Sequence, residues 1–340
     1  MVERGRMLGK KWFAVGAAAG LVLGMVPGTA VASGARCRSV EVPVAMSAGE
    51  PLTAKIAGTL CRPRGRDRGV LQVLLPGGGY DRTYWSWRGD PRGPSYVEAM
   101  NRAGYATLAL DRIGTGKSSA PPSTAFAPDS QTFTIHQVLR AFRHQRIVLV
   151  GNSLGSTVAR MIAVHHPADV DGLILTGESS TPNWSAFEQL GADYIPATQH
   201  PLLAGRRLDD GYGALRPGVR RSWFYYGPAA ADQVVARDEA NPEPDVFPTD
   251  PEFGSVLLNR KIKVPVLVVV GRHDRLICDT GAGGSDCSSS ATLLAGERPY
   301  YAPNADLQAL VVPNTGHVLN LHRTAPALYP LLAQWAQRHL

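Results

Sequence analysis

The stretch "IVLVGNSLGSTVARMIA", residues 147–163, places a serine on a sharp corner between two kinds of structure. Its apolar beginning, 147–150, is typical of a buried strand, and the residues from Leu154 onward are typical of a helix. Between them Ser153 stands in the pattern Gly-x-Ser-x-Gly. A strand that turns at once into a helix through this pattern is a nucleophile elbow, which projects the serine hydroxyl from the end of the strand. We therefore predict that Ser153 is a nucleophile.

The two glycines and the helix N-terminus suit this role. A β-carbon at Gly151 or Gly155 would collide with the neighbouring strand or helix, so we expect both positions to require glycine. The first N–H groups of a helix have no partner inside it, and they favour developing negative charge. The competing interpretation is that Ser153 is a helix N-cap beside a packing glycine.

Strands alternate with helices on both sides of this corner. The predicted strands cover residues 39–46, 52–61, 69–79, 105–111, 146–151, 171–177, 263–271 and 307–314. The predicted helices cover residues 95–103, 131–144, 154–165 and 324–340. This alternation predicts an α/β fold with a mostly parallel central sheet and helices on both faces. The first two strands predict an antiparallel edge on that sheet.

A serine hydroxyl is a weak nucleophile unless a base accepts its proton, and the chain has nine histidines. His317 lies in "PNTGHVLN" (313–320), just after the last predicted strand, where the end of the sheet would bring it over Ser153. Its nearest competitor is His322. The other candidates lie on the elbow helix, on an earlier helix or beside the predicted acid: His136, His144, His165, His166 and His273.

The histidine of such a site needs an anionic partner that fixes its tautomer and stabilises the imidazolium. Asp274 is the first acidic residue after the strand in "VLVVVGRHDRLICD" (266–279), so we predict that it is this partner. Two alternatives remain open. In the first, Asp274 is a loop carboxylate that pairs with Arg272 or Arg275. In the second, Asp279 is the acid.

The loop after the third predicted strand, "PGGGYDRTYW" (76–85), is rich in glycine, which lets a backbone approach a tetrahedral oxyanion closely. We predict that the N–H groups of Gly78 and Leu154 form the oxyanion hole. The N–H of Gly79 or of Tyr80 is the alternative to that of Gly78. Tyr80 and Trp85 are candidates for substrate contact. A phosphate-binding loop is the competing interpretation, but the loop has neither a GKS/T ending nor a GxGxxG motif.

The chain has 340 residues, enough for one large α/β domain with an insertion. Residues 178–260 lack strand-like apolar runs and are rich in proline and aromatic residues, so we predict a mainly helical insertion over one end of the sheet. The core then consists of residues 33–177 and 261–340. The aromatic residues of the insertion suggest a substrate with a mainly apolar part, although such residues more often pack against one another.

Residues 1–32 are typical of a secretory signal peptide. Basic residues precede an apolar stretch, 12–26, and Ala30 and Ala32 fit the small-residue cleavage rule, with Ser33 as the new N-terminus. The alternative is an uncleaved membrane anchor, but the apolar stretch is short for a bilayer span. We therefore expect a secreted protein that has no stable membrane anchor after the signal is removed.

Four cysteines in an exported chain favour two disulfides. Three pairings are possible, and the simplest joins Cys37 to Cys61 and Cys278 to Cys287. The first bond would tie the ends of the predicted hairpin, and the second would close a short loop just after Asp274. The alternatives are free thiols or a metal site, but no CxxC spacing indicates zinc.

The composition argues against nucleic-acid binding. The formal net charge is +7, and four basic residues against one acidic residue lie in the first 32 positions, so the remainder is only mildly basic. Charged residues make up 19% of the chain and form no long run. We expect a small-molecule substrate, no nucleic acid, and no need for a metal or an organic cofactor.

Over most of residues 38–340 these motifs resemble the α/β-hydrolase superfamily. The order of Ser153, Asp274 and His317 along the chain is the order of nucleophile, acid and histidine in that family. The segment "DRIGTGKSS" (111–119) is similar to the family's Asp-x-x-Gly-x-Gly-x-Ser segment after the fourth strand.

The glycine-rich loop resembles the family's oxyanion loop but carries Pro76 where histidine is common. Residues 178–260 occupy the place of the family's cap domain. The resemblance implies a serine hydrolase that cleaves carboxylic esters or lactones through an acyl-enzyme. The alternatives are a peptidase or amidase, a C–C bond hydrolase with the same triad, and a binding or biosynthetic member without turnover. Ser153 argues against the members that use an aspartate nucleophile.

Overall fold

The computed structural model describes residues 35–142, 145–250 and 252–340. Its strands are β1 (Arg36–Val44), β2 (Ala54–Arg62), β3 (Val70–Leu75), β4 (Ala106–Leu110), β5 (Arg146–Asn152), β6 (Gly172–Thr176), β7 (Tyr194–Pro196), β8 (Gly213–Leu215), β9 (Val266–Gly271) and β10 (Leu307–Val312). Its α-helices are α1 (Tyr96–Arg102), α2 (Ser130–Arg140), α3 (Leu154–His165), α4 (Trp184–Gly191), α5 (Arg220–Phe224), α6 (Asp232–Glu239), α7 (Ser290–Glu297) and α8 (Ala325–His339).

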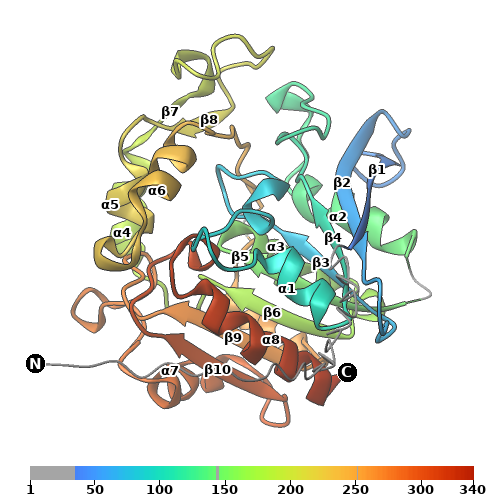
Figure 1. Ribbon diagram of the computed structural model, residues 1–340. Coiled ribbons are helices and arrows are strands. Elements are labelled where there is room, and N and C mark those ends of the chain that lie inside the picture. Colours follow the sequence, from blue (N-terminus) through green and yellow to red (C-terminus); the bar gives the residue numbers. More distant parts are fainter. Residues whose placement is uncertain (1–34, 143–144, 251) are drawn as a thin grey trace, which may run out of the picture. The chain divides into compact units, whose positions relative to one another are not determined.

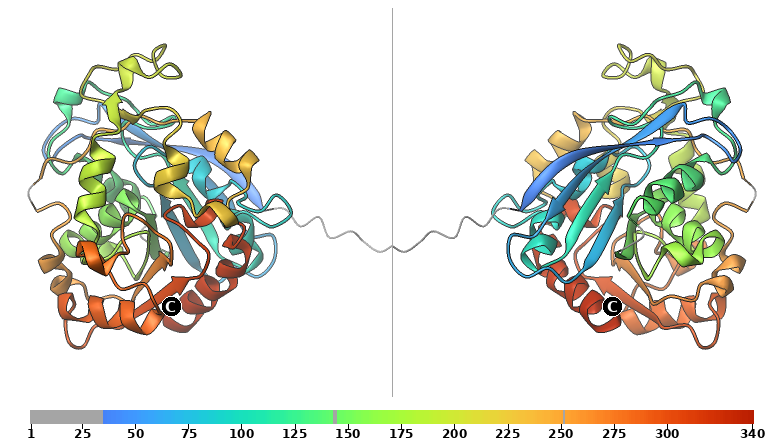
Figure 2. Two further views of the ribbon diagram at one scale, coloured as in Figure 1. Left: turned by 90° about the vertical axis from the view of Figure 1, so that its left-hand side faces the viewer. Right: turned by 90° about the vertical axis from the view of Figure 1, so that its right-hand side faces the viewer.

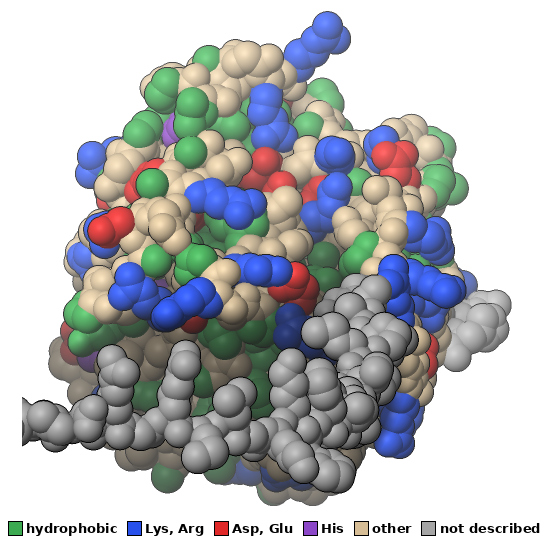
Figure 3. Space-filling view, viewed as in Figure 1, with side chains coloured by type: hydrophobic (Ala, Val, Ile, Leu, Met, Phe, Trp, Pro, Cys, Tyr) green, Lys and Arg blue, Asp and Glu red, His purple; other side chains and the backbone are tan. Residues whose placement is uncertain are grey.

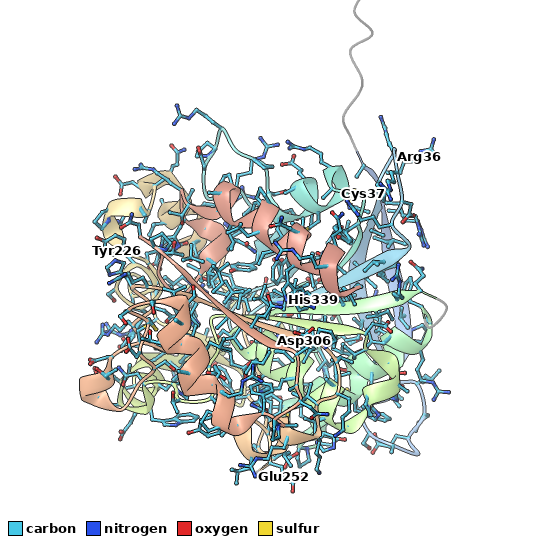
Figure 4. All side chains as sticks on the ribbon, turned by 90° about the horizontal axis from the view of Figure 1, so that it is seen from below. Arg36, Cys37, Tyr226, Glu252, Asp306 and His339 are labelled. Carbon is cyan, nitrogen blue, oxygen red and sulfur yellow. A yellow bond between two sulfur atoms is a disulfide. The ribbon has the colours of Figure 1, made fainter. Side chains whose placement is uncertain are left out.

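Eight strands form one sheet in the order β1-β2-β4-β3-β5-β6-β9-β10 (Figure 1). β2 runs antiparallel to both β1 and β4, and the other neighbours in the sheet are parallel. The structure therefore confirms the predicted fold class, including the antiparallel edge. In the β1–β2 ladder Cys37 is paired with Cys61, and a disulfide joins the two (Figure 4 labels Cys37).

Side chains of the central strands alternate between two apolar layers, which is why helices cover both faces of the sheet (Figure 2). In β5, Ile147 and Leu149 belong to one buried cluster, and Val148 and Val150 belong to the other. Helices α2, α3 and α7 pack into the first cluster, whereas α1 and α8 pack into the second.

Helix α8 runs on through Pro330 to His339. Near its end the Nδ1 atom of His339 lies 2.7 Å from Oδ2 of Asp306, the residue just before β10 (Figure 4).

The 178–260 segment contributes α4, α5, α6 and the antiparallel pair β7–β8 beside the sheet (Figure 1). The sequence predicts a mainly helical segment and does not foresee the two short strands β7 and β8, because three residues each are too few to show an alternating pattern. Part of this segment shares the core of the sheet: Trp223 and Phe224 belong to the same buried cluster as Val148.

The predicted signal peptide, residues 1–32, lies outside the described residues. In the part of the chain that the structure describes, no helix is both long enough and apolar enough to cross a membrane. On the face shown in Figure 3, Lys and Arg side chains are scattered among acidic and apolar ones and do not form a single patch.

Candidate active site

Ser153 lies between the end of β5 and the first residue of α3, with φ 50° and ψ −122°. Residues other than glycine rarely adopt this conformation, and it stores strain. A β-carbon on Gly151 would lie 2.3 Å from Cα of Ser156, and one on Gly155 would lie 2.2 Å from the carbonyl oxygen of Leu75. Close packing therefore requires both glycines, as the sequence predicted.

His317 and Asp274 form a buried pair beyond the ends of two neighbouring strands, β10 and β9. The Nδ1 atom of His317 lies 2.8 Å from Oδ2 and 3.0 Å from Oδ1 of Asp274. The carboxylate can only accept, so in the neutral imidazole Nδ1 carries the proton and Nε2 can accept another. Asp274 is itself held in place, because its Oδ1 accepts the N–H of Leu276 at 3.0 Å.

Ser153 and His317 line the same cavity. The side chain of Asn152, next to the serine, donates to the carbonyl oxygen of His317 at 3.3 Å. A β-carbon on Gly177, which follows β6, would lie 3.2 Å from Cε1 of His317 and 3.0 Å from Nδ2 of Asn152. Among the described residues, neither the Ser153 hydroxyl nor Nε2 of His317 has a hydrogen-bond partner. Both are therefore free to meet each other or a substrate.

His322, the competing base, has a different role. Its Nδ1–H donates to the carbonyl of Val318 at 2.9 Å, and its Nε2 accepts the N–H groups of Tyr226 at 3.0 Å and Gly316 at 3.1 Å. Burial lowers the pKa of His322 to about 4, so the ring stays neutral at physiological pH. Both nitrogens are occupied, and the side chain fixes the loop that carries His317.

Three of the remaining candidates, Asp279, His136 and His166, also lie in other environments, whereas His144 lies outside the described residues. Asp279, the alternative acid, is exposed and accepts the N–H of Gly281 at 3.0 Å. His136 contacts Asp169 at 2.6 Å and stacks on the ring of His166 at the end of α3. None of these residues lines the cavity that holds Ser153.

In the loop after β3, the backbone N–H groups of Gly78, Gly79 and Tyr80 differ in whether they already donate a hydrogen bond. The N–H of Gly79 donates to Oδ2 of Asp245 at 3.1 Å, and the N–H of Tyr80 donates to a carbonyl within the loop at 3.3 Å. Gly78 lines the cavity, and its N–H has no partner in the described parts of the chain; the same is true of Leu154. Of the three candidate donors in this loop, Gly78 is the one that remains available.

The cavity beside Ser153 has a volume of about 530 Å³ and a mainly apolar wall. Six of the ten aromatic residues of the 178–260 segment contribute to it: Trp184, Phe187, Tyr194, Phe224, Phe247 and Phe253. Its wall also contains Arg160 and Glu178, whose Nε and Oε1 atoms lie 3.0 Å apart. A concave apolar pocket with a few polar groups is typical of a small-molecule site.

Of the two predicted substrate contacts, the structure places only Tyr80 at the cavity. Trp85 is 1% exposed and packs edge-on against Tyr84 and Tyr96, with ring centroids 5.0 Å apart in each pair. The loop turns into a 3₁₀ helix (Arg82–Trp85) that packs into the core, so the prediction for Trp85 does not match the structure.

Comparison with known proteins identifies the family. Residues 72–328 match the model of the Alpha/beta hydrolase family. The chain belongs to this family. It is 32% identical over 247 residues to a 2-hydroxy-6-oxononadienedioate/2-hydroxy-6-oxononatrienedioate hydrolase of Burkholderia vietnamiensis, an alignment that covers 65% of this chain and 77% of the relative.

Other similar proteins are also hydrolases. Lipase 1 of Psychrobacter immobilis is 28% identical over 186 residues, which cover 53% of this chain and 57% of the lipase. Naproxen esterase of Bacillus subtilis shares the fold with a TM-score of 0.60 at 17% identity, over 89% of this chain and 92% of the esterase. This chain is therefore a hydrolase of the alpha/beta family.

The sequence did not single out two buried arginines beside the glycine-rich loop of this alpha/beta hydrolase. Arg112 contacts Asp245, and Arg220 contacts Asp238. Arg112 stands inside the "DRIGTGKSS" segment, which is a signal that could have found it. Asp245 lies in a proline-rich stretch without a recognisable motif, so nothing in the sequence connects it to the site.

Proposed function

We propose that this hydrolase is an exported serine enzyme that cleaves carboxylic esters or lactones. The observation that carries the proposal is the arrangement around one cavity: the Ser153 elbow, the buried pair of His317 and Asp274, and the N–H groups of Gly78 and Leu154, which have no partner within the described residues. The two disulfides, Cys37–Cys61 and Cys278–Cys287, support export, because such bonds persist in oxidising compartments.

In the proposed mechanism, Nε2 of His317 accepts the proton of Ser153 while the serine oxygen attacks the carbonyl carbon. The electron pair of the C=O bond moves to oxygen, and the N–H groups of Gly78 and Leu154 stabilise that oxyanion. The C=O bond then re-forms, the bond from the carbonyl carbon to the alcohol oxygen breaks, and the imidazolium, stabilised by Asp274, protonates the leaving alkoxide. In the second half, water attacks the acyl-enzyme and gives its proton to His317, the bond to the Ser153 oxygen breaks, and His317 returns the proton to that oxygen as the acid is released.

The cavity wall favours an ester with an apolar acyl or alcohol part. Each CH₂ group buried there stabilises the bound state by about 0.8 kcal/mol, or about fourfold in kcat/KM. The Burkholderia relative raises C–C bond hydrolysis of a dioate as a second candidate. A dioate carries two carboxylates, whereas Arg160, the one Arg or Lys among the described lining residues, already pairs with Glu178. This favours the ester.

Labelling with a fluorophosphonate probe tests the nucleophile. We expect the probe to label the wild-type protein, and Ser153→Ala to abolish labelling and lower ester turnover by about 10⁴-fold or more. In a series of p-nitrophenyl esters from acetate upward, kcat/KM should rise about fourfold per CH₂ until the cavity is filled. A folded wild-type protein that is neither labelled nor active on esters or lactones would contradict the proposal. Faster turnover of aminoacyl anilides would indicate an amidase instead.

A further inference from the structure

A buried arginine from another part of the chain holds the carbonyl groups of the oxyanion loop. Arg112 follows β4 and has no exposed surface, with a fractional exposure of 0%. Its Nε donates to the carbonyl of Pro76 at 3.0 Å, and its Nη2 donates to the carbonyl of Gly77 at 2.9 Å. One planar guanidinium therefore fixes two successive peptide units.

The second of these peptide units contains the N–H of Gly78. A trans peptide is planar, and its C=O and N–H point in opposite directions. Fixing the Gly77 carbonyl on Arg112 therefore fixes the direction of the Gly78 N–H on the opposite side of the same plane. A hydrogen bond to the carbonyl also polarises the peptide, which makes its N–H a better donor.

Asp245 fixes the next peptide unit. Its Oδ1 accepts from Nη1 of Arg112 at 2.9 Å, and its Oδ2 accepts both from Nη2 of Arg112 and from the N–H of Gly79, the latter at 3.1 Å. Asp245 comes from the 178–260 segment, where its backbone pairs with Gly213. The two peptide units that flank the Cα of Gly78 are thus held by opposite partners of one buried ion pair.

Stability alone is a weak reason for such a pair. Removing two charges from water costs about as much free energy as their attraction returns, so a buried ion pair often contributes little compared with apolar residues of similar volume. Directed hydrogen bonds to the peptides on both sides of Gly78 provide a different reason, because an oxyanion donor must point to one place before the reaction begins.

We propose that Arg112 and Asp245 are positioning residues that aim the N–H of Gly78 into the cavity, where it stabilises the oxyanion. The proposal rests on the proposed function, in which Gly78 is an oxyanion donor. Neither side chain lines the cavity in the described structure, so each acts through the loop and not through substrate contact.

Arg112→Lys tests this role, because a lysine keeps the charge beside Asp245 but cannot hold two carbonyls and a carboxylate in one rigid fork. We expect kcat for a p-nitrophenyl ester to fall about 10- to 100-fold with KM changed less than about threefold. A trifluoromethyl ketone, which forms an oxyanion on the serine, should lose affinity in parallel. The alcohol analogue of the same compound, which forms none, should bind as before.

Arg298→Lys is the matched control. The guanidinium of Arg298 also holds two carbonyls, those of Ala305 at 2.9 Å and Leu307 at 3.2 Å, but neither of these carbonyls belongs to the loop after β3. Its replacement should leave kcat and ketone affinity unchanged, whatever it does to the melting temperature.

Asp245→Asn is the second variant, and it keeps the proposal testable if Arg112→Lys does not fold. We expect a smaller loss, about 3- to 10-fold in kcat, again in parallel with ketone affinity. A folded variant of either residue with full kcat, or one that loses substrate affinity while ketone affinity is kept, overturns the inference. An inactive wild-type protein would instead overturn the proposed function on which it depends.

Discussion

Ser153 is held in a conformation that costs of the order of 1–3 kcal/mol on its own. The packing around it makes that conformation unavoidable, because Gly151 and Gly155 bring the strand and helix backbones so close that no side chain fits between them. The same conformation places Ser153 at the wall of the cavity and, among the described residues, leaves the N–H of Leu154 without a partner. If Ser153 is the proposed nucleophile, backbone geometry prepares it for reaction before any substrate binds.

Glu297, at the end of α7, gives a prediction at the scale of one residue. Its carboxyl accepts the N–H and the hydroxyl of Ser180 at 2.7 and 2.6 Å, and burial raises its pKa from 4.5 to about 7. The folded chain therefore binds this proton more tightly than the unfolded chain, and the stability due to Glu297 falls as the pH rises from 4.5 to 7.

Glu297→Gln should remove this pH dependence. Relative to its value near pH 4.5, the difference in unfolding free energy between variant and wild type should shift by about 3 kcal/mol in favour of the variant by pH 8. Urea unfolding between pH 4.5 and 8 measures the shift. Glu188→Gln, at an exposed position on α4, controls for the loss of a carboxylate from the surface. A constant difference across this range would show that Glu297 is ionised throughout.

At the scale of elements, neighbouring strands bring the candidate residues together. β3, β5, β6, β9 and β10 are adjacent and parallel, so the loops that follow them meet at one edge of the sheet. The loop after β9 is closed by the Cys278–Cys287 disulfide, and the N–H of Cys278 donates to the carbonyl of Asp274 at 2.8 Å. The disulfide therefore stiffens the loop that carries Asp274.

Removing each disulfide in turn gives a matched pair of variants that tests whether the Cys278–Cys287 bond stiffens the loop with Asp274. Opening either one, as Cys278→Ser with Cys287→Ser or as Cys37→Ser with Cys61→Ser, should lower the free energy of unfolding by about 3 kcal/mol. Only the first should also lower kcat on esters, because the second bond ties β1 to β2 at the opposite edge of the sheet. Urea unfolding and ester kinetics on both double variants measure the two effects. An equal loss of kcat in both would show that the loop gains no support from its disulfide.

The sequence could predict what local patterns determine. The corner at Ser153 and the strand ends before Asp274 and His317 are three separate patterns, each only a few residues long. The sheet then brings these three parts of the chain together. The contact of Arg112 with Asp245 joins positions 133 residues apart, and no local pattern records it. The prediction that Trp85 contacts substrate fails for a related reason. The sequence shows that an aromatic residue follows the loop, but tertiary packing decides whether it lines the cavity or packs into the core.

At the scale of the whole molecule, the 178–260 segment and the sheet share one interior. Trp223 and Val234 of this segment belong to the same buried cluster as Leu74 of β3 and Leu332 of α8. The buried pair of Arg112 and Asp245 joins the two parts a second time, and breaking such a pair costs about 3–5 kcal/mol. The segment can therefore not open without exposing apolar surface and an unpaired charge of the core.

We accordingly expect the 178–260 segment and the sheet to unfold in one cooperative step. Hydrogen exchange read by mass spectrometry at increasing urea measures this directly. Peptides from 220–239 and from 147–163 should lose protection at the same denaturant concentration, and Asp245→Asn should move both midpoints down together. If the 220–239 amides exchange at a lower concentration while the sheet stays protected, the segment opens independently. The position of the Gly78 N–H would then depend on whether the segment is closed at the moment of reaction.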